Sequence, residues 1–154
     1  MYKLIALDMD GTTFNEEHEI SNEVKDSLFY AISKGVKIAF ISGREEFTVK
    51  EILKKLELDT YYGALNGSLI STTYSEVPKF VKSLEKKYIF DILDIVESNG
   101  FSPIVFLEDL IFTNDSNDEY VEIISKFISP KILRVKDIKE YIKNNNLEEK
   151  VLKI

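Results

Sequence analysis

Two aspartates, Asp8 and Asp10, stand one residue apart directly after an apolar run near the start of the chain. A carboxylate pair at the end of a buried segment is costly unless a cation is held close to it. Gly11 and two threonines follow, and glycine allows a sharp turn that aims backbone N–H groups at an anion. The stretch from residue 6 to residue 14 therefore predicts a site for a metal ion, a phosphate group, or both.

The same residue types could carry out a phosphoryl transfer. A carboxylate such as that of Asp8, neutralised by a divalent cation, can attack a phosphorus atom and form an aspartyl-phosphate. An acid two positions on, Asp10, can deliver a proton to the departing alkoxide and later take one from water. Ser42, expected at the end of the next strand and at the head of a helix, could add a hydroxyl and a helix N-terminus to the same anion. The chain thus contains a nucleophile, a proton donor and an anion site in the order that this chemistry needs.

Strands and helices alternate through the first half of the chain. Ser21 fits the N-cap of a helix that ends at Gly35, and a second helix fits residues 45–56. The first apolar run is nearly continuous, as expected of a strand buried on both faces of a parallel sheet. Apolar runs predict three strands in all, over residues 2–7, 36–41 and 61–65.

This alternation is typical of one half of a doubly wound sheet, in which ligands bind beyond the carboxyl ends of the strands. The dipeptide of Asn66 and Gly67 is a strong turn signal, so residues 68–72 should pair back on the third strand as a hairpin. Polar groups that converge from three separate strands favour a binding or catalytic site over unrelated polar residues on the surface. Four polar residues fall at the predicted carboxyl ends: Asp8, Asp10, Ser42 and Asn66.

The second half of the chain has a different pattern, which predicts an α+β module with a boundary near residues 73–80. A long amphipathic helix fits residues 81–98, with Gly100 as its stop. Two apolar runs flank Glu108 and Asp109 and predict an antiparallel hairpin. Four further elements are expected: a helix through residues 120–127, a strand at 131–135, a short helix at 138–142 and a final strand at 150–154.

Composition limits the classes of function. The chain has 154 residues, of which 44% are hydrophobic, so it can form the core of one ordinary domain or of one small domain with an insertion. Its net charge of -7 argues against nucleic acid and anionic membranes as partners. No apolar stretch is long enough to cross a bilayer, and there is no signal-peptide layout, so the cytoplasm is the expected location. Without cysteine, the chain has neither disulfides nor thiolate metal sites.

Two polar stretches are interpreted without catalytic chemistry. The only histidine, His18, lies in a run of glutamates and is read as a solvated loop residue. The acidic run at residues 114–118 is read as a helix-capping loop. It is not read as a calcium site, because the glycine and the terminal glutamate of such a loop are absent.

Three motifs stand at the ends of predicted strands: DMDGTT at residues 8–13, ISGR at 41–44 and ALNGSLI at 64–70. Together they resemble the haloacid dehalogenase-like superfamily, specifically its Cof-type sugar-phosphatase branch. The D-x-D-G-T element is the most specific of the three. The resemblance covers the whole chain. It implies an α/β fold in which half of a doubly wound Rossmann-like parallel sheet, over residues 1–77, precedes an α/β cap over residues 78–154.

The resemblance also implies roles for individual residues. Asp8 would be the nucleophile and a magnesium ligand, and Asp10 the general acid and base and a ligand through its backbone carbonyl. The implied cofactor is Mg²⁺, and the implied partner is a small phosphorylated metabolite such as a sugar phosphate. The remaining residues implied to hold or border the phosphate are Thr12, Ser42, Gly43, Arg44 and Asn66.

Two features of this branch have no counterpart here: a lysine that neutralises the nucleophile and the phosphate, and an acidic element that completes the metal site. By the resemblance, both follow the cap, and the chain stops at Ile154 inside it. The expected function is thus that of a magnesium-dependent phosphatase represented by an incomplete chain, and two alternatives stay open: a phosphomutase, and an inactive remnant that binds phosphate. Without strands from beyond the cap, the first strand would be an exposed apolar sheet edge. Three explanations stay open: the natural chain continues beyond Ile154, a second copy covers the edge, or the protein is a remnant.

Overall fold

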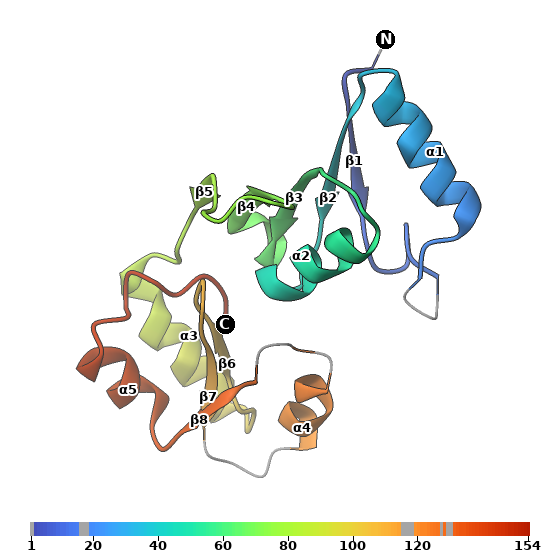
Figure 1. Ribbon diagram of the computed structural model, residues 1–154. Helices are drawn as coiled ribbons and strands as arrows, with labels where there is room; N and C mark the ends of the chain where they lie inside the picture. Colours follow the sequence, from blue (N-terminus) through green and yellow to red (C-terminus); the bar gives the residue numbers. More distant parts are fainter. Residues whose placement is uncertain (1, 16–18, 115–118, 127, 129–130) are drawn as a thin grey trace. The chain divides into compact units, whose positions relative to one another are not determined.

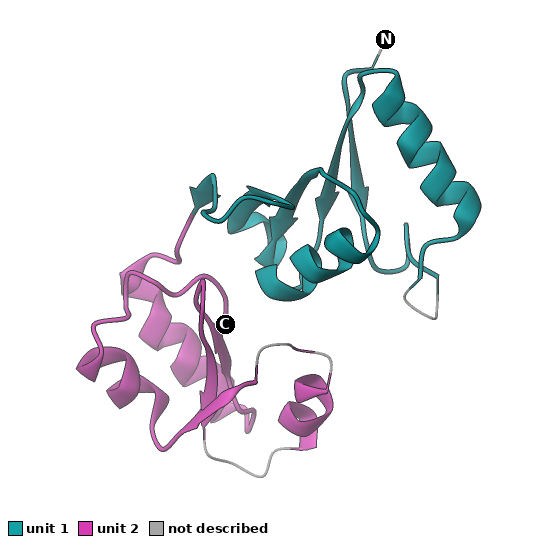
Figure 2. Cartoon of the chain, viewed as in Figure 1, with its two compact units in different colours: residues 1–81 teal, residues 82–154 magenta. Residues whose placement is uncertain are grey.

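The computed structural model describes residues 2–15, 19–114, 119–126, 128 and 131–154. The chain folds as two compact units, residues 1–81 and residues 82–154 (Figure 2). Each unit has its own sheet and its own helices (Figure 1). The interpretations of His18 and of the acidic residues 115–118 concern positions outside the described residues.

The first unit is a mixed sheet with two α-helices. Its strands lie in the order β1-β2-β3-β4-β5; β1, β2 and β3 run parallel, whereas β4 and β5 are each antiparallel to the strand before them. This arrangement confirms the predicted α/β fold class, including the hairpin after the third strand. The elements are β1 (Leu4–Asp8), α1 (Asn22–Ser33), β2 (Lys37–Ile41), α2 (Glu46–Lys55), β3 (Tyr61–Ala64), the 3₁₀ turn η1 (Leu65–Gly67), β4 (Leu69–Thr72) and β5 (Phe80–Val81).

Local sequence signals account for both ends of α1. The Oγ of Ser21 accepts a hydrogen bond from the N–H of Val24 at 3.3 Å, so this serine is the N-cap, as predicted. Gly35 follows the helix with a φ of +77°, a left-handed conformation that glycine adopts without strain. Its N–H donates to the carbonyl of Ile32 at 2.9 Å. This C-terminal cap leads directly into β2, the strand that ends beside Ser42.

One face of this sheet is covered by α2. Successive side chains of a strand point to opposite faces, and Phe40 of β2 is paired with Tyr62 of β3, so the two share a face. Both side chains are fully buried. The hydroxyl of Tyr62 donates a hydrogen bond to Glu46 of α2 at 2.5 Å. Burial raises the pKa of Tyr62 well above its usual range, so its hydroxyl remains a proton donor at neutral pH.

The opposite face carries exposed apolar side chains, and we call it the open face. Ile41 is paired with Gly63, Gly63 with Ile70, and Ile70 with Phe80. Ile41, Ile70 and Phe80 therefore lie in one row across the sheet, and all three are exposed. The first unit thus presents a strip of apolar surface on its open face.

The prediction that the first strand is buried on both faces is wrong. β1 is an edge strand, with β2 as its one neighbour among the described residues, and Leu4 is 52% exposed. Apolar side chains on an uncovered edge stay in contact with solvent. The structure agrees instead with the second expectation for this strand, that it forms an exposed apolar edge of the sheet.

The second unit combines a three-stranded sheet with helices. The strands β6 and β7 form an antiparallel hairpin, as predicted, and β8 joins β7 in parallel. Ile89 and Leu93 of α3 belong to the same buried cluster as Phe112 of β7 and Ile142 of α5. The elements are α3 (Lys86–Ser98), β6 (Ile104–Phe106), β7 (Ile111–Asn114), α4 (Glu119–Ser125), β8 (Leu133–Val135) and α5 (Ile138–Asn144).

Two predicted boundaries differ from the structure. The helix expected from residue 81 begins at Lys86, because Phe80 and Val81 form β5 and pair with β4 instead. Aromatic and β-branched residues favour strands, and at this position the β4 edge is available to them. The final strand expected at residues 150–154 is reduced to a single bridge between Phe106 and Lys153.

The packing of α2 yields a prediction about stability. Leu53 is fully buried in this helix, whereas Phe47 in the same helix is exposed. We expect Leu53→Ala to lower the free energy of unfolding by about 2–5 kcal/mol, because it leaves a cavity. Phe47→Ala should lower it by less than about 1 kcal/mol. Urea titrations followed by circular dichroism measure both variants, and equal losses would contradict the assignment of the core.

Candidate active site

Three loops meet at the carboxyl ends of β1, β2 and β3. The N–H of Leu65 donates to the carbonyl of Arg44 at 2.8 Å, and the N–H of Asn66 donates to the carbonyl of Ser42 at 3.0 Å. These bonds join the loop after β2 to the loop after β3. The side chain of Arg44 reaches Asp10 in the loop after β1. Polar residues from three strands are therefore held together by direct hydrogen bonds.

The loop after β1 turns around the buried side chain of Met9. The carbonyl of Met9 accepts a hydrogen bond from the N–H of Thr13 at 3.1 Å. The Oγ of Thr13, a buried residue, donates to the carbonyl of Asp8 at 2.6 Å. Gly11 lies within this turn with a φ of +72°, where a side chain would be strained. These contacts fix the backbone on both sides of Asp10.

Thr13 is a member of this loop that sequence reasoning missed. Only Thr12 was assigned to the site, and its Oγ donates to Oδ2 of Asp8 at 3.3 Å. The second threonine holds the backbone carbonyl of the same aspartate. The signal in the sequence was the pair of adjacent threonines directly after Gly11, since both hydroxyls can donate hydrogen bonds to the residue that ends the strand.

Asp8 ends β1 with an exposed side chain. The hydrogen bond from Thr12 is long, and among the described residues no salt bridge involves Asp8. Its carboxylate therefore keeps an oxygen that a cation or an electrophile can approach from solvent.

Asp10 and Arg44 form a two-point ion pair. The Nε of Arg44 donates to Oδ2 of Asp10 at 2.8 Å, and Nη2 donates to Oδ1 at 2.5 Å. Such fork geometry combines charge attraction with a fixed orientation. The hydrogen bonds that Arg44 donates to Asp10 raise the pKa of Arg44, so the guanidinium stays charged. The resemblance implied that Arg44 lies at the edge of the site but not that it pairs with Asp10.

Ser42 lies at the end of β2, yet it is not the cap of the following helix. The N-cap of α2 is Glu45, whose side chain accepts a hydrogen bond from the N–H of Thr48 at 3.2 Å. The expectation that Ser42 heads the helix is therefore wrong by three residues. Ser42 is buried, and its Oγ accepts the N–H of Arg44 at 3.1 Å. Its hydroxyl, with the exposed Gly43 beside it, shapes the loop that presents Arg44.

Asn66 occupies the turn after β3. It has a left-handed conformation, with φ 58° and ψ 29°, which asparagine tolerates better than most residues. Its side chain is exposed, while its backbone N–H is held by the Ser42 carbonyl. The turn thus fixes the third of the three loops at the same edge of the sheet.

The oxygen donors at this edge of the sheet determine which kind of metal ion can bind there. Within the part of the chain that the structure describes, no three Asp, Glu, His or Cys side chains form a group that could hold a metal ion. Asp8 offers an exposed carboxylate, while the carboxylate of Asp10 is bound by Arg44. Mg²⁺ usually uses one or two carboxylates together with waters and substrate phosphates. These oxygen donors therefore fit a magnesium ion shared with a phosphate better than a cage made only of protein.

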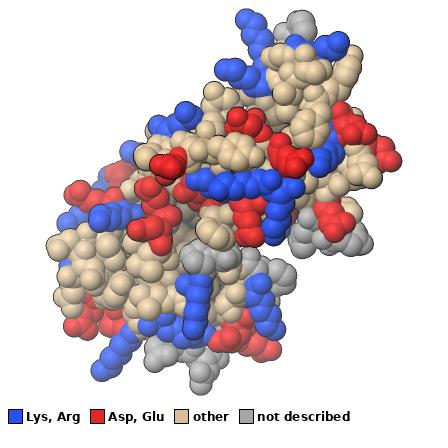
Figure 3. All heavy atoms as spheres, viewed as in Figure 1, with Lys and Arg blue, Asp and Glu red and all other residues tan. Residues whose placement is uncertain are grey.

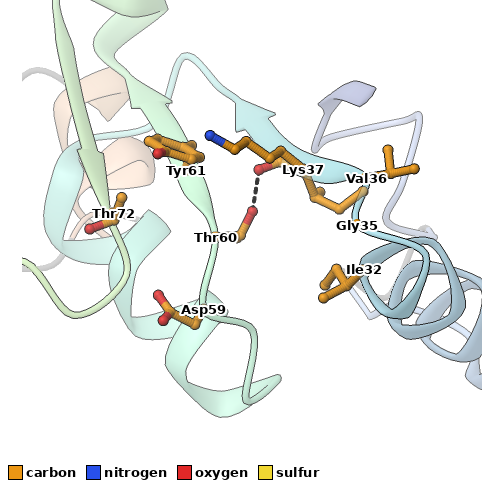
Figure 4. A pocket seen from close by; sticks show the side chains of 9 residues that line it. Ile32, Gly35, Val36, Lys37, Asp59, Thr60, Tyr61 and Thr72 are labelled. Atoms are coloured by element: carbon orange, nitrogen blue, oxygen red, sulfur yellow. Dashed lines mark hydrogen bonds between the residues drawn. The ribbon is translucent and has the colours of Figure 1, made fainter. Parts of the chain in front are cut away.

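A separate hollow of about 420 Å³ opens at the amino ends of β2 and β3 (Figure 4). Lys37 and Tyr61 border it, with the Lys37 Nζ 5.6 Å from the centre of the tyrosine ring. Both are the first residues of their strands, whereas Asp8 and Ser42 lie at or just after the last residues of theirs. The hollow is thus at the opposite end of the strands from the candidate site.

Acidic and basic side chains are interspersed over the face drawn in Figure 3. In the whole chain, 27 acids outnumber 20 bases. None of the described helices combines the length and the apolar character that crossing a membrane requires.

Comparison with known proteins decides the family. Residues 5–154 match the family model described as haloacid dehalogenase-like hydrolase. The chain belongs to this family. The match includes all three loops of the candidate site and both compact units.

Individual relatives share only part of their length with this member of the family. Phosphatase YwpJ of Bacillus subtilis is 31% identical over 121 residues, which are 79% of this chain and 42% of YwpJ. The 5-amino-6-(5-phospho-D-ribitylamino)uracil phosphatase YcsE of the same organism is 41% identical over 68 residues, which are 44% of this chain and 27% of YcsE. The chain therefore spans less than half the length of these curated relatives.

A solved structure of another protein is similar to this chain in fold as well as in sequence. The haloacid dehalogenase-like hydrolase from B. subtilis has a TM-score of 0.76 and is 25% identical. The alignment covers 92% of this chain and 56% of that one. The α/β fold of this chain is therefore that of the family.

Proposed function

We propose that this chain carries the nucleophile of a magnesium-dependent phosphatase, and that the nucleophile is Asp8. The observation that most supports the proposal is the exposed carboxylate of Asp8 at the carboxyl end of β1, with Asp10 held two residues further on. The names of the two curated relatives, both phosphatases, point the same way. Because the chain spans less than half of each, the activity of the whole protein is part of the proposal.

In the first step, an oxygen of Asp8 attacks the phosphorus atom of a phosphate monoester. The bond between phosphorus and the substrate's alkoxy oxygen breaks, which leaves an aspartyl-phosphate. The departing oxygen takes a proton from Asp10 and leaves as an alcohol. The residues proposed to bind the phosphoryl oxygens are Thr12, Ser42, Gly43, Arg44 and Asn66.

In the second step, water attacks the phosphorus atom of the aspartyl-phosphate. Asp10 accepts a proton from this water, so it returns to the protonated form from which it started. The bond between phosphorus and the Asp8 oxygen breaks, and inorganic phosphate leaves. Asp8 is then a carboxylate again and can begin the next cycle.

Arg44 couples substrate binding to proton transfer by Asp10. The guanidinium engages both carboxylate oxygens of Asp10, so Asp10 can hold and transfer a proton only when this pair opens. A phosphate offers a guanidinium the same two-oxygen geometry. We therefore expect substrate to draw Arg44 away from Asp10 and to leave an Asp10 oxygen accessible for the proton.

The role of Arg44 predicts a specific loss. Arg44→Lys keeps the charge but removes the fork, so we expect kcat/KM to fall by about ten- to a hundredfold, mainly through a higher KM. Arg134→Lys is the matched control, because Arg134 pairs with Glu122 in the second unit. Steady-state kinetics of both variants test the prediction. Equal activity of Arg44→Lys and wild type would contradict a role for Arg44 in binding the substrate.

Magnesium is the proposed cofactor, held by the carboxylate of Asp8 and the backbone carbonyl of Asp10. When bound, it would neutralise the charges of the nucleophile and of the phosphate. The exposed oxygen of Asp8 and the lack of a three-carboxylate group in the described residues support an ion that is shared with the substrate.

We expect dialysis against a chelator to abolish phosphate release, and added Mg²⁺ to restore it. Titration calorimetry with Mg²⁺ gives a second readout that does not depend on turnover. Wild type should bind the ion more tightly in the presence of inorganic phosphate, and Asp8→Asn should not bind it measurably. Phosphate release that is unchanged in the chelator would overturn the magnesium assignment.

The proposed substrates are small phosphorylated metabolites, with sugar phosphates as the favoured class and the Cof-type branch as the proposed subgroup. The relative YcsE is named for a substrate with a phosphorylated ribityl group, which supports a polyhydroxylated carrier. The second compact unit, residues 82–154, is the proposed cap that distinguishes one carrier from another. The test is phosphate release from an aryl phosphate and from a panel of sugar phosphates, with and without Mg²⁺.

A phosphate-binding protein without turnover is the second candidate. It is favoured by one observation, that Arg44 binds both carboxylate oxygens of Asp10, the residue proposed to transfer the proton. Binding of inorganic phosphate without release from any member of the panel would select this candidate over the phosphatase.

A further inference from the structure

Thr13 differs from its neighbour Thr12 both in burial and in the hydrogen bond that it makes. Thr12 is exposed, and its Oγ donates to the carboxylate of Asp8 at 3.3 Å. Thr13 is buried, and its Oγ donates to the backbone carbonyl of Asp8 at 2.6 Å. The bond from Thr13 is the shorter and the better protected from water, so it is the stronger of the two. Thr13 therefore holds the main chain of the residue that carries the proposed nucleophile.

The carbonyl that Thr13 binds belongs to the peptide group between Asp8 and Met9. Because a peptide group is planar, turning it would swing the backbone that follows, and Asp10 lies only two residues beyond Asp8. The next carbonyl, that of Met9, accepts hydrogen bonds from the N–H of Thr13 at 3.1 Å and from the N–H of Phe14 at 2.9 Å. Residues 13 and 14 thus fix both peptide groups that join the two aspartates.

Buried side chains anchor the far end of this loop. Thr13 and Phe14 are both buried, as is Met9 at the start of the loop. Asp10 and Phe14 also form a β-bridge. Closely packed side chains cannot shift without leaving a void, so residues 13 and 14 are a rigid support. The hydroxyl of Thr13 is the point at which this support meets the end of β1.

We propose that Thr13 is a positioning residue, whose hydroxyl fixes the spacing between the carboxylate of Asp8 and the side chain of Asp10 during phosphoryl transfer. This inference rests on the proposed function, in which both aspartates act on one phosphoryl group. A misplacement of about 1 Å can slow a reaction by about a hundredfold. Loss of the hydroxyl should therefore lower kcat. It should change KM little, because most of the residues proposed to bind the phosphoryl oxygens lie in the loops after β2 and β3.

The same hydrogen bond should affect binding of the proposed metal ion. Magnesium is assigned to the carboxylate of Asp8 and the backbone carbonyl of Asp10, and the peptide groups that Thr13 and Phe14 hold lie between these two oxygens along the chain. A backbone that can rotate there presents the two oxygens less precisely. Binding of Mg²⁺ in the presence of inorganic phosphate therefore reports on the positioning without any turnover.

Three substitutions separate positioning from stability. Thr13→Val removes the hydroxyl and keeps the branched shape of the side chain, whereas Thr13→Ser keeps the hydroxyl. Thr60→Val is the matched control, because Thr60 is a buried threonine of the same unit whose Oγ also donates to a backbone carbonyl, that of Ile38. Thr60 precedes β3, at the opposite end of the strands from Asp8. Both valine variants lose one buried hydrogen bond, so both should unfold at a lower urea concentration than wild type.

Steady-state kinetics with an aryl phosphate at saturating Mg²⁺, and calorimetry with Mg²⁺ and inorganic phosphate, compare these variants. Thr13→Val should lower kcat by about ten- to a hundredfold, with KM within about threefold of wild type, and should weaken Mg²⁺ binding by at least about fivefold. Thr13→Ser and Thr60→Val should keep kcat and Mg²⁺ binding within about threefold of wild type.

Equal losses of kcat in Thr13→Val and Thr60→Val, or no recovery in Thr13→Ser, would overturn the positioning role. Asp8→Asn decides which of the two claims has failed. If Asp8→Asn is inactive while Thr13→Val is as active as wild type, the positioning role alone is wrong. If Asp8→Asn releases phosphate as wild type does, the proposed function is wrong. A wild-type chain that neither releases phosphate nor binds Mg²⁺ would overturn both.

Discussion

Asp8→Asn is expected to abolish phosphate release, with a fall in kcat of at least about a thousandfold. The amide that replaces the carboxylate is neutral and cannot form the aspartyl-phosphate on which the proposed reaction depends. The fold should survive, because the Asp8 side chain is exposed and the hydrogen bond that it accepts from Thr12 is long.

The matched control for this variant is Asp59→Asn. Asp59 is also exposed and lies in the same unit, but it borders the hollow at the amino ends of the strands. Its substitution should leave phosphate release unchanged. Release that persists in Asp8→Asn, or that is lost equally in Asp59→Asn, would show that Asp8 is not the nucleophile.

Asp10→Asn is expected to slow hydrolysis of alkyl phosphates by about a hundred- to ten-thousandfold, the range typical of a lost general acid or base. The loss in the first step should be smaller for an aryl phosphate, because a phenolate leaves without first taking a proton. The second step still needs Asp10 to accept a proton from water. The variant should therefore release phenol in one rapid burst and then stall as the phosphorylated protein.

Stopped-flow measurement of phenol and phosphate from an aryl phosphate separates these two steps. A burst of phenol that approaches one equivalent of protein, followed by slow phosphate release, is the expected result for Asp10→Asn. A variant that loses alkyl and aryl substrates equally and shows no burst would contradict the role of Asp10. In that case its ion pair with Arg44 would be structural.

Most of the first unit could be predicted because its signals are local. Ser21 caps α1 and Gly35 ends it, and both effects depend on residues within one helical turn. The turn at Asn66 and Gly67 could be predicted equally well, since both residues adopt the left-handed conformation that this dipeptide favours. The order of parallel strands then follows from the alternation of strands and helices.

The errors fall where neighbours in space decide the outcome. The apolar run of β1 is compatible with a central strand and with an uncovered edge, and only the absence of a second neighbour among the described residues separates the two. Phe80 and Val81 could extend a helix, but β4 offers them a strand to pair with. At residues 150–154 the apolar pattern predicts a strand, whereas the described backbone makes one bridge to Phe106.

The candidate site could be predicted by residue type but not by contact. Strand ends place Asp8, Ser42 and Asn66 at one edge of a sheet, so their proximity is a consequence of topology. The pairing of Arg44 with Asp10 depends on the rotamers of two side chains that stand 34 residues apart. The N-cap of α2 is Glu45 and not Ser42, because three residues, 42–44, lie between the end of β2 and this cap.

The most direct test of the reaction on Asp8 is to trap the phosphorylated protein. Wild-type chain is mixed with Mg²⁺ and an aryl phosphate, quenched in acid within one turnover, and analysed by intact and peptide mass spectrometry. We predict a single phosphoryl group on the peptide that contains Asp8, and none in Asp8→Asn. Phosphate release without a phosphorylated peptide, or with the phosphoryl group on another residue, would contradict Asp8 as the nucleophile.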